Sequence, residues 1–219
     1  MEYFSVQQAA KSLGVSEVQV GRLISQGDLI ASRFGRSWMI DPRSVNRYAD
    51  LHPSRGRPLP PSRAWELLKS SSVSSLEEAR ELAVHCRRRA ERREVRVLPG
   101  LLDRVREDSR VVLSGVDAAR HFGAAVSVMP PLDFYIRRGD FQSFSKDFVV
   151  HQDFAEFNCV VRIVDVPMFV DTPMGNHVPL LVALVDLIAE GDYRSAKEAF
   201  RCLEVPHDKQ QGKSSIRSS

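Results

Sequence analysis

Two helix-start signals stand eleven residues apart near the N-terminus, and this short spacing restricts what the opening segment can fold into. Ser5 is followed three residues later by Gln8, and Ser16 by Gln19, so each serine begins a capping-box pattern. Apolar residues at helical spacing follow both serines, and Gly14 is placed to end the first helix. Only a tight turn fits between the two helices. This arrangement predicts a helix-turn-helix.

Two short β-prone runs follow the second helix and predict a hairpin. They are Leu29 to Phe34 and Ser37 to Ile40, and a Gly-Arg pair separates them. Asp41 and Pro42 then supply an N-cap and a first-turn proline for a third helix, Arg43 to Ala49. Two helices, a small basic hairpin and a closing helix together predict a winged helix-turn-helix over residues 1–50.

The opening segment resembles the excisionase-type, MerR-like family of DNA-binding domains over about 45 residues. The matching residues are Ala9, Leu13, Gly14, Val15, Ser16, Val20, Arg22, Leu23, Ile24, Gly27, Leu29, Ala31, Arg33, Gly35, Arg36, Trp38 and Ile40. The resemblance implies binding to double-stranded DNA. Gly21 departs from the family pattern, where a larger residue usually stands, and glycine destabilises a helix interior by about 1 kcal/mol relative to alanine.

A helix that reads DNA needs polar side chains near its N-terminus for base edges, and cations beside it for phosphates. The candidates are Ser16, Glu17, Gln19 and Arg22 on the second helix, Arg33 and Arg36 at the hairpin tip, and Arg43 and Arg47 on the third helix. Gln19 or Arg22 could make bidentate base contacts, and the other arginines suit phosphates. The alternative for each arginine is a solvated surface charge. Trp38 is expected to pack in the core.

The net charge of +3 conceals two oppositely charged segments. Residues 51–110 carry fourteen basic and nine acidic side chains, whereas residues 111–205 carry eight and thirteen. Such asymmetry favours a polyanion as partner of the front part, and the alternative is a set of solvated helix faces. The chain has no apolar run long enough for a membrane span and no export signal at its start, so a cytoplasmic protein is expected.

Composition also predicts the domain boundaries. Residues 51–62 hold four prolines and are expected to form an extended linker, and residues 206–219 have too few apolar side chains to fold and are expected to be a disordered tail. Residues 63–205 remain as a second domain. The three cysteines are widely spaced, which predicts free thiols without disulfides or a zinc site, and no cofactor is expected.

The second domain begins with an arginine-rich helix. Ser75 and Glu78 form a helix start, and apolar residues at helical spacing continue to Ala90. The last turns carry Arg87, Arg88, Arg89, Arg92 and Arg93. Cations near a helix C-terminus interact favourably with its dipole. Five arginines exceed that need, so phosphate binding is the second interpretation.

Short strands and helices alternate after residue 110, which predicts an α+β fold. The expected strands are residues 110–113, 134–137, 148–151 and 159–164, and the expected helices are residues 63–68, 115–122, 140–144, 179–189 and 193–203. His121, His151 and His177 are isolated and are interpreted as structural or surface residues. Asp186 and Glu190, one turn apart, are interpreted as a solvated face.

A small-residue loop at Ser114 and Gly115, followed later by Asp133 on a strand, resembles part of a nucleotidyltransferase. Such enzymes need paired carboxylates for Mg²⁺, and Tyr135 stands where the second is needed. A divergent nucleotidyltransferase is therefore kept only as an alternative, and the chain is expected not to be an enzyme.

Residues 63–204 resemble the C-terminal part of abortive-infection (AbiE-type) antitoxins of type IV toxin–antitoxin systems. The resemblance rests on residues 112–115 with Ala118, Ala119 and Gly123, on residues 134–137 and 161–164, and on the helix from Pro179 to Ile188. It implies a repressor that binds its own operator and counters a neighbouring nucleotidyltransferase toxin.

We therefore expect a sequence-specific DNA-binding repressor acting as an antitoxin. The first alternative is an excisionase-like architectural factor that bends DNA. One reading helix covers few base pairs, so binding as a homodimer or to paired sites is expected.

Overall fold

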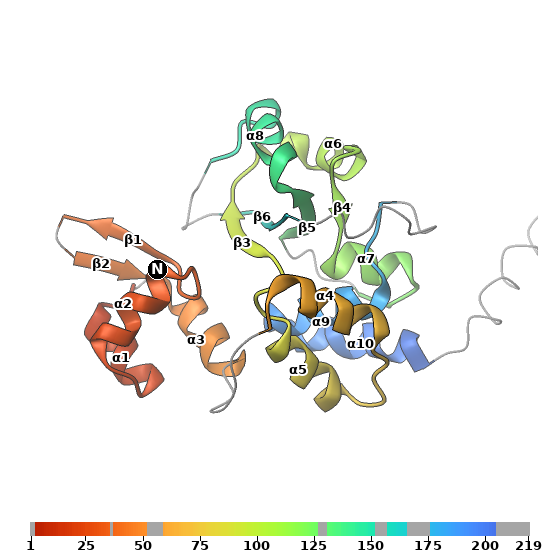
Figure 1. The fold of residues 1–219 in the computed structure, drawn as a ribbon. Coiled ribbons are helices and arrows are strands. Elements are labelled where there is room, and N and C mark those ends of the chain that lie inside the picture. Colours follow the sequence, from red (N-terminus) through yellow and green to blue (C-terminus); the bar gives the residue numbers. More distant parts are fainter. Residues whose placement is uncertain are drawn as a thin grey trace, which may run out of the picture.

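The computed structural model describes residues 3–35, 37–51, 59–126, 131–151, 157–165 and 176–204. Within these residues the chain folds into ten α-helices, one 3₁₀-helix and two β-sheets, which confirms the predicted α+β class (Figure 1). Residues 3–51 are called the N-terminal unit below, and residues 59–204 the C-terminal unit. The boundary between them falls in the predicted linker, of which residues 52–58 lie outside the described residues, as does the predicted tail.

The N-terminal unit has the predicted order of elements. They are α1 (Val6–Leu13), α2 (Glu17–Ser25), β1 (Ala31–Phe34), β2 (Ser37–Ile40) and α3 (Pro42–Leu51). The Ser5 hydroxyl accepts a bond from the Gln8 amide at 3.2 Å, and the Gln8 side chain accepts one from the Ser5 amide at 2.7 Å. Gly14 ends α1 with a φ of +67°, a conformation that favours glycine. The capped turn is therefore as predicted.

A small core holds the N-terminal unit together. Buried Val20 and Leu23 of α2 pack with Ala9 of α1, Ile40 of β2 and Val45 of α3. Val20 and Leu23 lie three positions apart on α2 and therefore share its buried face. The opposite face of that helix points outward.

A four-stranded sheet is the centre of the C-terminal unit. Its strands lie in the order β3 (Glu91–Val95), β6 (Cys159–Val164), β5 (Leu132–Arg137) and β4 (Val112–Leu113). Strands β5 and β6 are parallel, and the other two pairs are antiparallel. Alternate residues of β5 enter different cores, because Tyr135 packs in one hydrophobic cluster whereas Phe134 and Ile136 pack in the other.

Helices also contribute side chains to both clusters, and Figure 1 shows their arrangement around the sheet. Around Tyr135 lie α4 (Pro61–Ser70), α5 (Leu76–His85), α7 (Gly115–His121), α9 (Leu180–Ala189) and α10 (Tyr193–Glu204). The other cluster contains side chains of α6 (Leu102–Glu107) and α8 (Arg138–Asp147). None of the helices that the structure describes is both long and apolar enough to cross a membrane. Cys86 and Cys159 are buried free thiols, and Cys202 is a half-buried one.

Two local predictions were wrong in this unit. The arginine-rich helix ends at His85, and Glu91–Val95 is strand β3 rather than a further helical turn. Every residue of β3 pairs with a residue of β6. This pairing outweighs the weak helical pattern, since strand formation depends on neighbouring strands more than on local preference. Residues 148–151 form no strand, because α8 continues to Asp147 and only His151 makes a bridge, to Arg96. The short helices over residues 99–107 were not predicted.

Candidate nucleic-acid interface

The outward face of α2 is the candidate surface for reading DNA. Its members are Glu17, Val18, Gly21, Arg22 and Ser25, and all five are exposed. Val18 is 69% exposed, which is unusual for a large apolar residue and shows that no described element covers this face. The helix nearest to the C-terminal unit is α3, so α2 keeps a free side (Figure 1).

The predicted base-reading residues lie at different depths on α2. Ser16 caps the helix, and its hydroxyl accepts a bond from the Gln19 amide at 3.2 Å. The side chain of Glu17 is exposed, and Gln19 is half-buried at the edge of the face. Arg22 is exposed and makes no ion pair with any residue in the described ranges. Its five donors are therefore directed to solvent, which makes Arg22 the best placed of the four for a bidentate base contact.

Gly21 stands in the middle of this face, and a Cβ added there would meet nothing within 4 Å. We expect Gly21→Ala to stabilise the free protein by about 0.5–1 kcal/mol, because alanine is the better helix former and no clash opposes it. Chemical denaturation measures the change. Gly14→Ala is the matched control and should destabilise, since its φ of +67° disfavours a side chain. Loss of stability in both variants would contradict the placement of Gly21.

The hairpin places a second set of side chains beside α2. The Arg33 guanidinium lies 5.5 Å from the centre of the Trp38 ring, directly across the two strands. Trp38 is half-buried and packs against the N-terminal core, as predicted. Phe34 at the tip is 74% exposed. Arg36, the other predicted contact at the tip, lies outside the described residues.

The two arginines of α3 differ in burial, because the side chain of Arg43 is 43% exposed whereas that of Arg47 is 14% exposed. Arg43 is held by Asp41, at 2.9 Å between Nη2 and Oδ2, and its guanidinium lies over the Phe157 ring. Arg47 approaches Glu94 at 3.5 Å and Glu190 at 3.7 Å, both in the C-terminal unit. Burial lowers the pKa of Arg47 to about 10, with the charge of Arg92 acting in the same direction. Arg47 therefore joins the two units, in contrast to the exposed phosphate contact that the sequence predicted.

The five arginines of the segment 87–93 are also separated by the fold. Arg89 is buried and donates to the Tyr135 hydroxyl and to Asp186. Arg92 donates to Glu190 at 2.7 and 2.8 Å and to Glu94 at 2.8 Å, and Arg93 pairs with Glu91. These three cannot form the continuous phosphate-binding helix face that was expected, because the segment is a turn and a strand. Arg87 and Arg88 remain at the surface between the units.

The interpretation of Asp186 and Glu190 as a solvated face was wrong. Asp186 is fully buried and accepts hydrogen bonds from Arg89, Tyr135 and Ser114. Glu190 binds Arg92 and also Arg162, at 2.8 Å. The physical reason is that α9 is apolar on all sides and lies in the core, so a carboxylate on it must be paired with a cation.

Glu190 predicts a pH dependence of stability. Burial alone would raise the pKa of Glu190, but the charges of Arg92, Arg162 and Arg47 outweigh it and lower the pKa far below its ordinary value. A lowered folded-state pKa stabilises the fold above the unfolded-state pKa, roughly 4.3, and this contribution is lost as the pH falls.

The expected result is that Glu190→Gln is clearly less stable than the wild type at pH 7, and that the gap narrows steadily below about pH 4.5. Urea unfolding across this range measures it. Glu204→Gln, at an exposed position of α10, is the matched control and should show a much smaller gap. A gap for Glu190→Gln that stays constant with pH would refute the assignment.

The nucleotidyltransferase-like residues Asp133 and Tyr135 are both hydrogen-bonded to other buried side chains. Both oxygens of Asp133 accept bonds from Arg162, at 2.7 and 2.8 Å, and the Tyr135 hydroxyl donates to Asp186 at 3.0 Å. Gly115 has a φ of +54°, and a Cβ there would come within 3.1 Å of the Asp133 Cβ. The described residues contain no group of three or more His, Cys, Asp or Glu side chains arranged to hold a metal ion. The rings of His121 and His177 stack with their centroids 4.2 Å apart, so the prediction that these two histidines are isolated was wrong.

Comparison with known proteins agrees with the geometry of the N-terminal unit. A family model described as a helix-turn-helix domain matches residues 3–50. This range spans α1, α2, the hairpin and most of α3, so the chain carries a DNA-binding helix-turn-helix domain. No curated protein and no solved structure matches the chain.

Proposed function

We propose that the protein is a sequence-specific DNA-binding transcriptional repressor whose α2 enters the major groove. The observation that carries the proposal is the uncovered face of α2, with Arg22 at its centre and an exposed basic hairpin beside it. Base readout needs a helix that projects polar side chains from a supported core, and α2 has both features. The hairpin and its Arg33 would contact the backbone or the minor groove alongside.

Selection from a pool of random duplexes tests sequence specificity. The full chain should enrich one short motif, present twice if two copies bind together, and a footprint on the promoter upstream of its own gene should cover the same motif. A pool that remains random after several rounds, with binding governed only by salt, would contradict sequence-specific reading.

The finer proposal is that the repressor is an antitoxin. It is supported by the resemblance of residues 63–204 to AbiE-type antitoxins and by the coupling of both units through Arg47 and Arg88. Co-expression with a nucleotidyltransferase encoded beside its gene provides the test. Growth should be restored by the full chain, and growth arrest that persists despite equal expression would refute this role without affecting the DNA-binding proposal.

A second candidate function is an architectural factor that bends DNA, and the exposed Phe34 at the hairpin tip favours it. Apolar side chains inserted between base steps kink a duplex. Circular-permutation gel shifts distinguish the two. A bend that disappears in Phe34→Ser would favour the architectural role. DNA that the wild-type protein does not bend would rule out the architectural role and leave the repressor role as the proposed function.

A further inference from the structure

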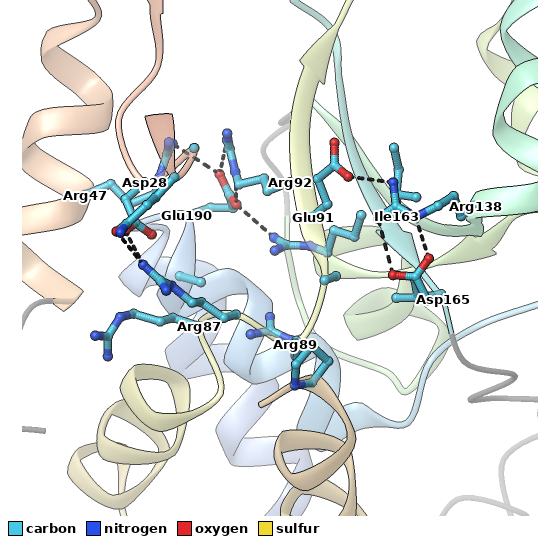
Figure 2. Close-up of a pocket in the computed structure, with 18 of the residues that line it drawn as sticks. Asp28, Arg47, Arg87, Arg89, Glu91, Arg92, Arg138, Ile163, Asp165 and Glu190 are labelled. Atoms are coloured by element: carbon cyan, nitrogen blue, oxygen red, sulfur yellow. Dashed lines mark hydrogen bonds and ion pairs between the residues drawn. The ribbon is translucent and has the colours of Figure 1, made fainter. Parts of the chain in front are cut away.

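A cavity of about 430 Å³ lies where the two units meet (Figure 2). Its walls include Gln26 to Asp28 at the end of α2, Tyr48 of α3, and the turn at Arg87 and Arg88. Sites for small molecules have volumes of roughly 300–1,000 Å³ and are common at domain interfaces. The size and the position therefore suit a small ligand rather than a stretch of duplex.

The wall is rich in arginine. Seven arginine side chains line the cavity, against four carboxylates. Three of these arginines also pair with carboxylates outside the lining, namely Arg89 with Asp186, Arg92 with Glu94 and Arg162 with Asp133. Figure 2 shows Arg47, Arg92 and Glu190 on one side of it, and Arg138 with Glu91 and Asp165 on the other. Several guanidinium groups thus meet in one recess, which is the arrangement that binds anions with more than one charge.

The guanidinium of Arg87 has N–H donors that remain available to a ligand. Its Nη1 donates to the Val84 carbonyl at 3.0 Å, and no carboxylate in the described part of the chain pairs with it. Arg88 is bound to Asp28 at 2.8 Å but its side chain is still 42% exposed. Burial lowers the pKa of Arg87, and the charge of Asp28 opposes this shift without outweighing it.

The remainder of the wall is apolar. Ala90, Ile163, Val164 and Ala189 line it, and Tyr48 adds an aromatic ring. A cavity with guanidinium groups on part of its wall and apolar side chains on the rest fits a molecule that has both an anionic and an organic part.

We propose that this cavity binds a small phosphorylated organic anion of nucleotide size. A ligand must compete with carboxylates that already hold most of the arginines. A phosphate group, with nearly two negative charges and three acceptor oxygens, competes better than a single carboxylate. Arg87 and Arg88 would hold the phosphate, and the apolar wall would hold the organic part.

Binding there would couple the ligand to α2. The residues that end α2 form one wall, and residues 87–92 form another, so a bound ligand fixes the angle of the reading helix against the C-terminal unit. This coupling rests on the proposed function, whereas ligand binding itself does not require DNA.

Calorimetry on the full chain without DNA tests the binding, with pyrophosphate and ADP as probes at constant ionic strength. We expect one saturable site, tighter for ADP, and at least tenfold weaker binding of both probes to Arg87→Gln. Arg104→Gln, an exposed arginine on α6 away from the cavity, is the matched control and should bind as the wild type does. Thermal melts of all three proteins verify folding.

Absence of binding at millimolar concentrations of the probes would overturn the proposal. An equal loss of probe affinity in Arg87→Gln and Arg104→Gln would overturn it as well. Equal affinity for ADP and pyrophosphate would overturn the role of the apolar wall. An Arg87→Gln variant that binds both probes normally but binds DNA weakly would show a backbone contact instead, leaving the DNA-binding function intact and the cavity proposal wrong.

Discussion

Replacing Arg22 by alanine is expected to weaken binding to the selected duplex by about 10- to 100-fold, while binding to an unrelated duplex falls only slightly. The reason is that a bidentate contact to a base edge contributes about 1–3 kcal/mol of discrimination, whereas a phosphate contact contributes to all sequences alike. Arg22 is exposed on α2 and is held by no ion pair among the described residues, so its loss leaves the fold intact. Gel-shift titrations on both duplexes measure the ratio.

Two further variants separate charge from readout. Arg22→Lys keeps the charge but loses the planar fork, so specificity should fall almost as far as in Arg22→Ala. Arg33→Ala should weaken both duplexes equally and reduce the slope of log affinity against log salt by about 1. Arg22→Ala with the same affinity ratio as the wild type would refute base readout by this residue.

Replacing Asp186 by alanine is expected to lower the free energy of unfolding by about 3–5 kcal/mol. The substitution removes a fully buried acceptor that serves Arg89, Tyr135 and Ser114. Arg89 is then left as a buried charge with no carboxylate, and the cost of that unpaired charge exceeds the value of the lost contact itself. Urea denaturation gives the free energy directly.

A double variant tests the cause. Arg89→Met combined with Asp186→Leu removes both charges and fills their space, so this variant should be markedly more stable than Asp186→Ala. Glu204→Ala at an exposed position of α10 is the control and should change stability by less than about 0.5 kcal/mol. A double variant as unstable as the single one would show that packing, rather than the unpaired charge, decides the loss.

The parts of the fold that could be predicted depend on contacts between residues that are close together in the sequence. The caps at Ser5 and Ser16 and the turn at Gly14 involve contacts within a few positions, so the sequence pattern reveals them. The strand Cys159–Val164 was predicted with its true bounds because it is apolar and β-branched along most of its length.

The buried ion-pair cluster could not be predicted in the same way. Arg89 and Asp186 are 97 residues apart in the chain, and the charge of a residue does not reveal a partner at that distance. One signal was present, namely a single carboxylate inside the otherwise apolar segment 180–189. A carboxylate in a buried helix requires a cation nearby, and the densest run of cations in the chain is residues 87–93. Strand β3 was missed for a similar reason, since its pairing partner β6 and the Glu190 carboxylate that binds Arg92 both lie far along the chain.

The α2 face was better predicted than the α3 face, and the reason is physical. Exposure of a helix face follows from its own apolar pattern, which identifies the buried side of α2. Whether Arg47 on α3 faces solvent depends on where the C-terminal unit docks, and the local pattern contains no information about that.

Photo-crosslinking from the outward face of α2 tests the central claim most directly. A benzophenone amino acid replaces Val18, and a matched protein carries it at Leu203, which is exposed near the C-terminal end of α10. With both proteins bound to the selected duplex, the Val18 position should crosslink to bases inside the motif and the Leu203 position should not. Bound complexes that crosslink to no base from Val18, or equally from both positions, would contradict the account.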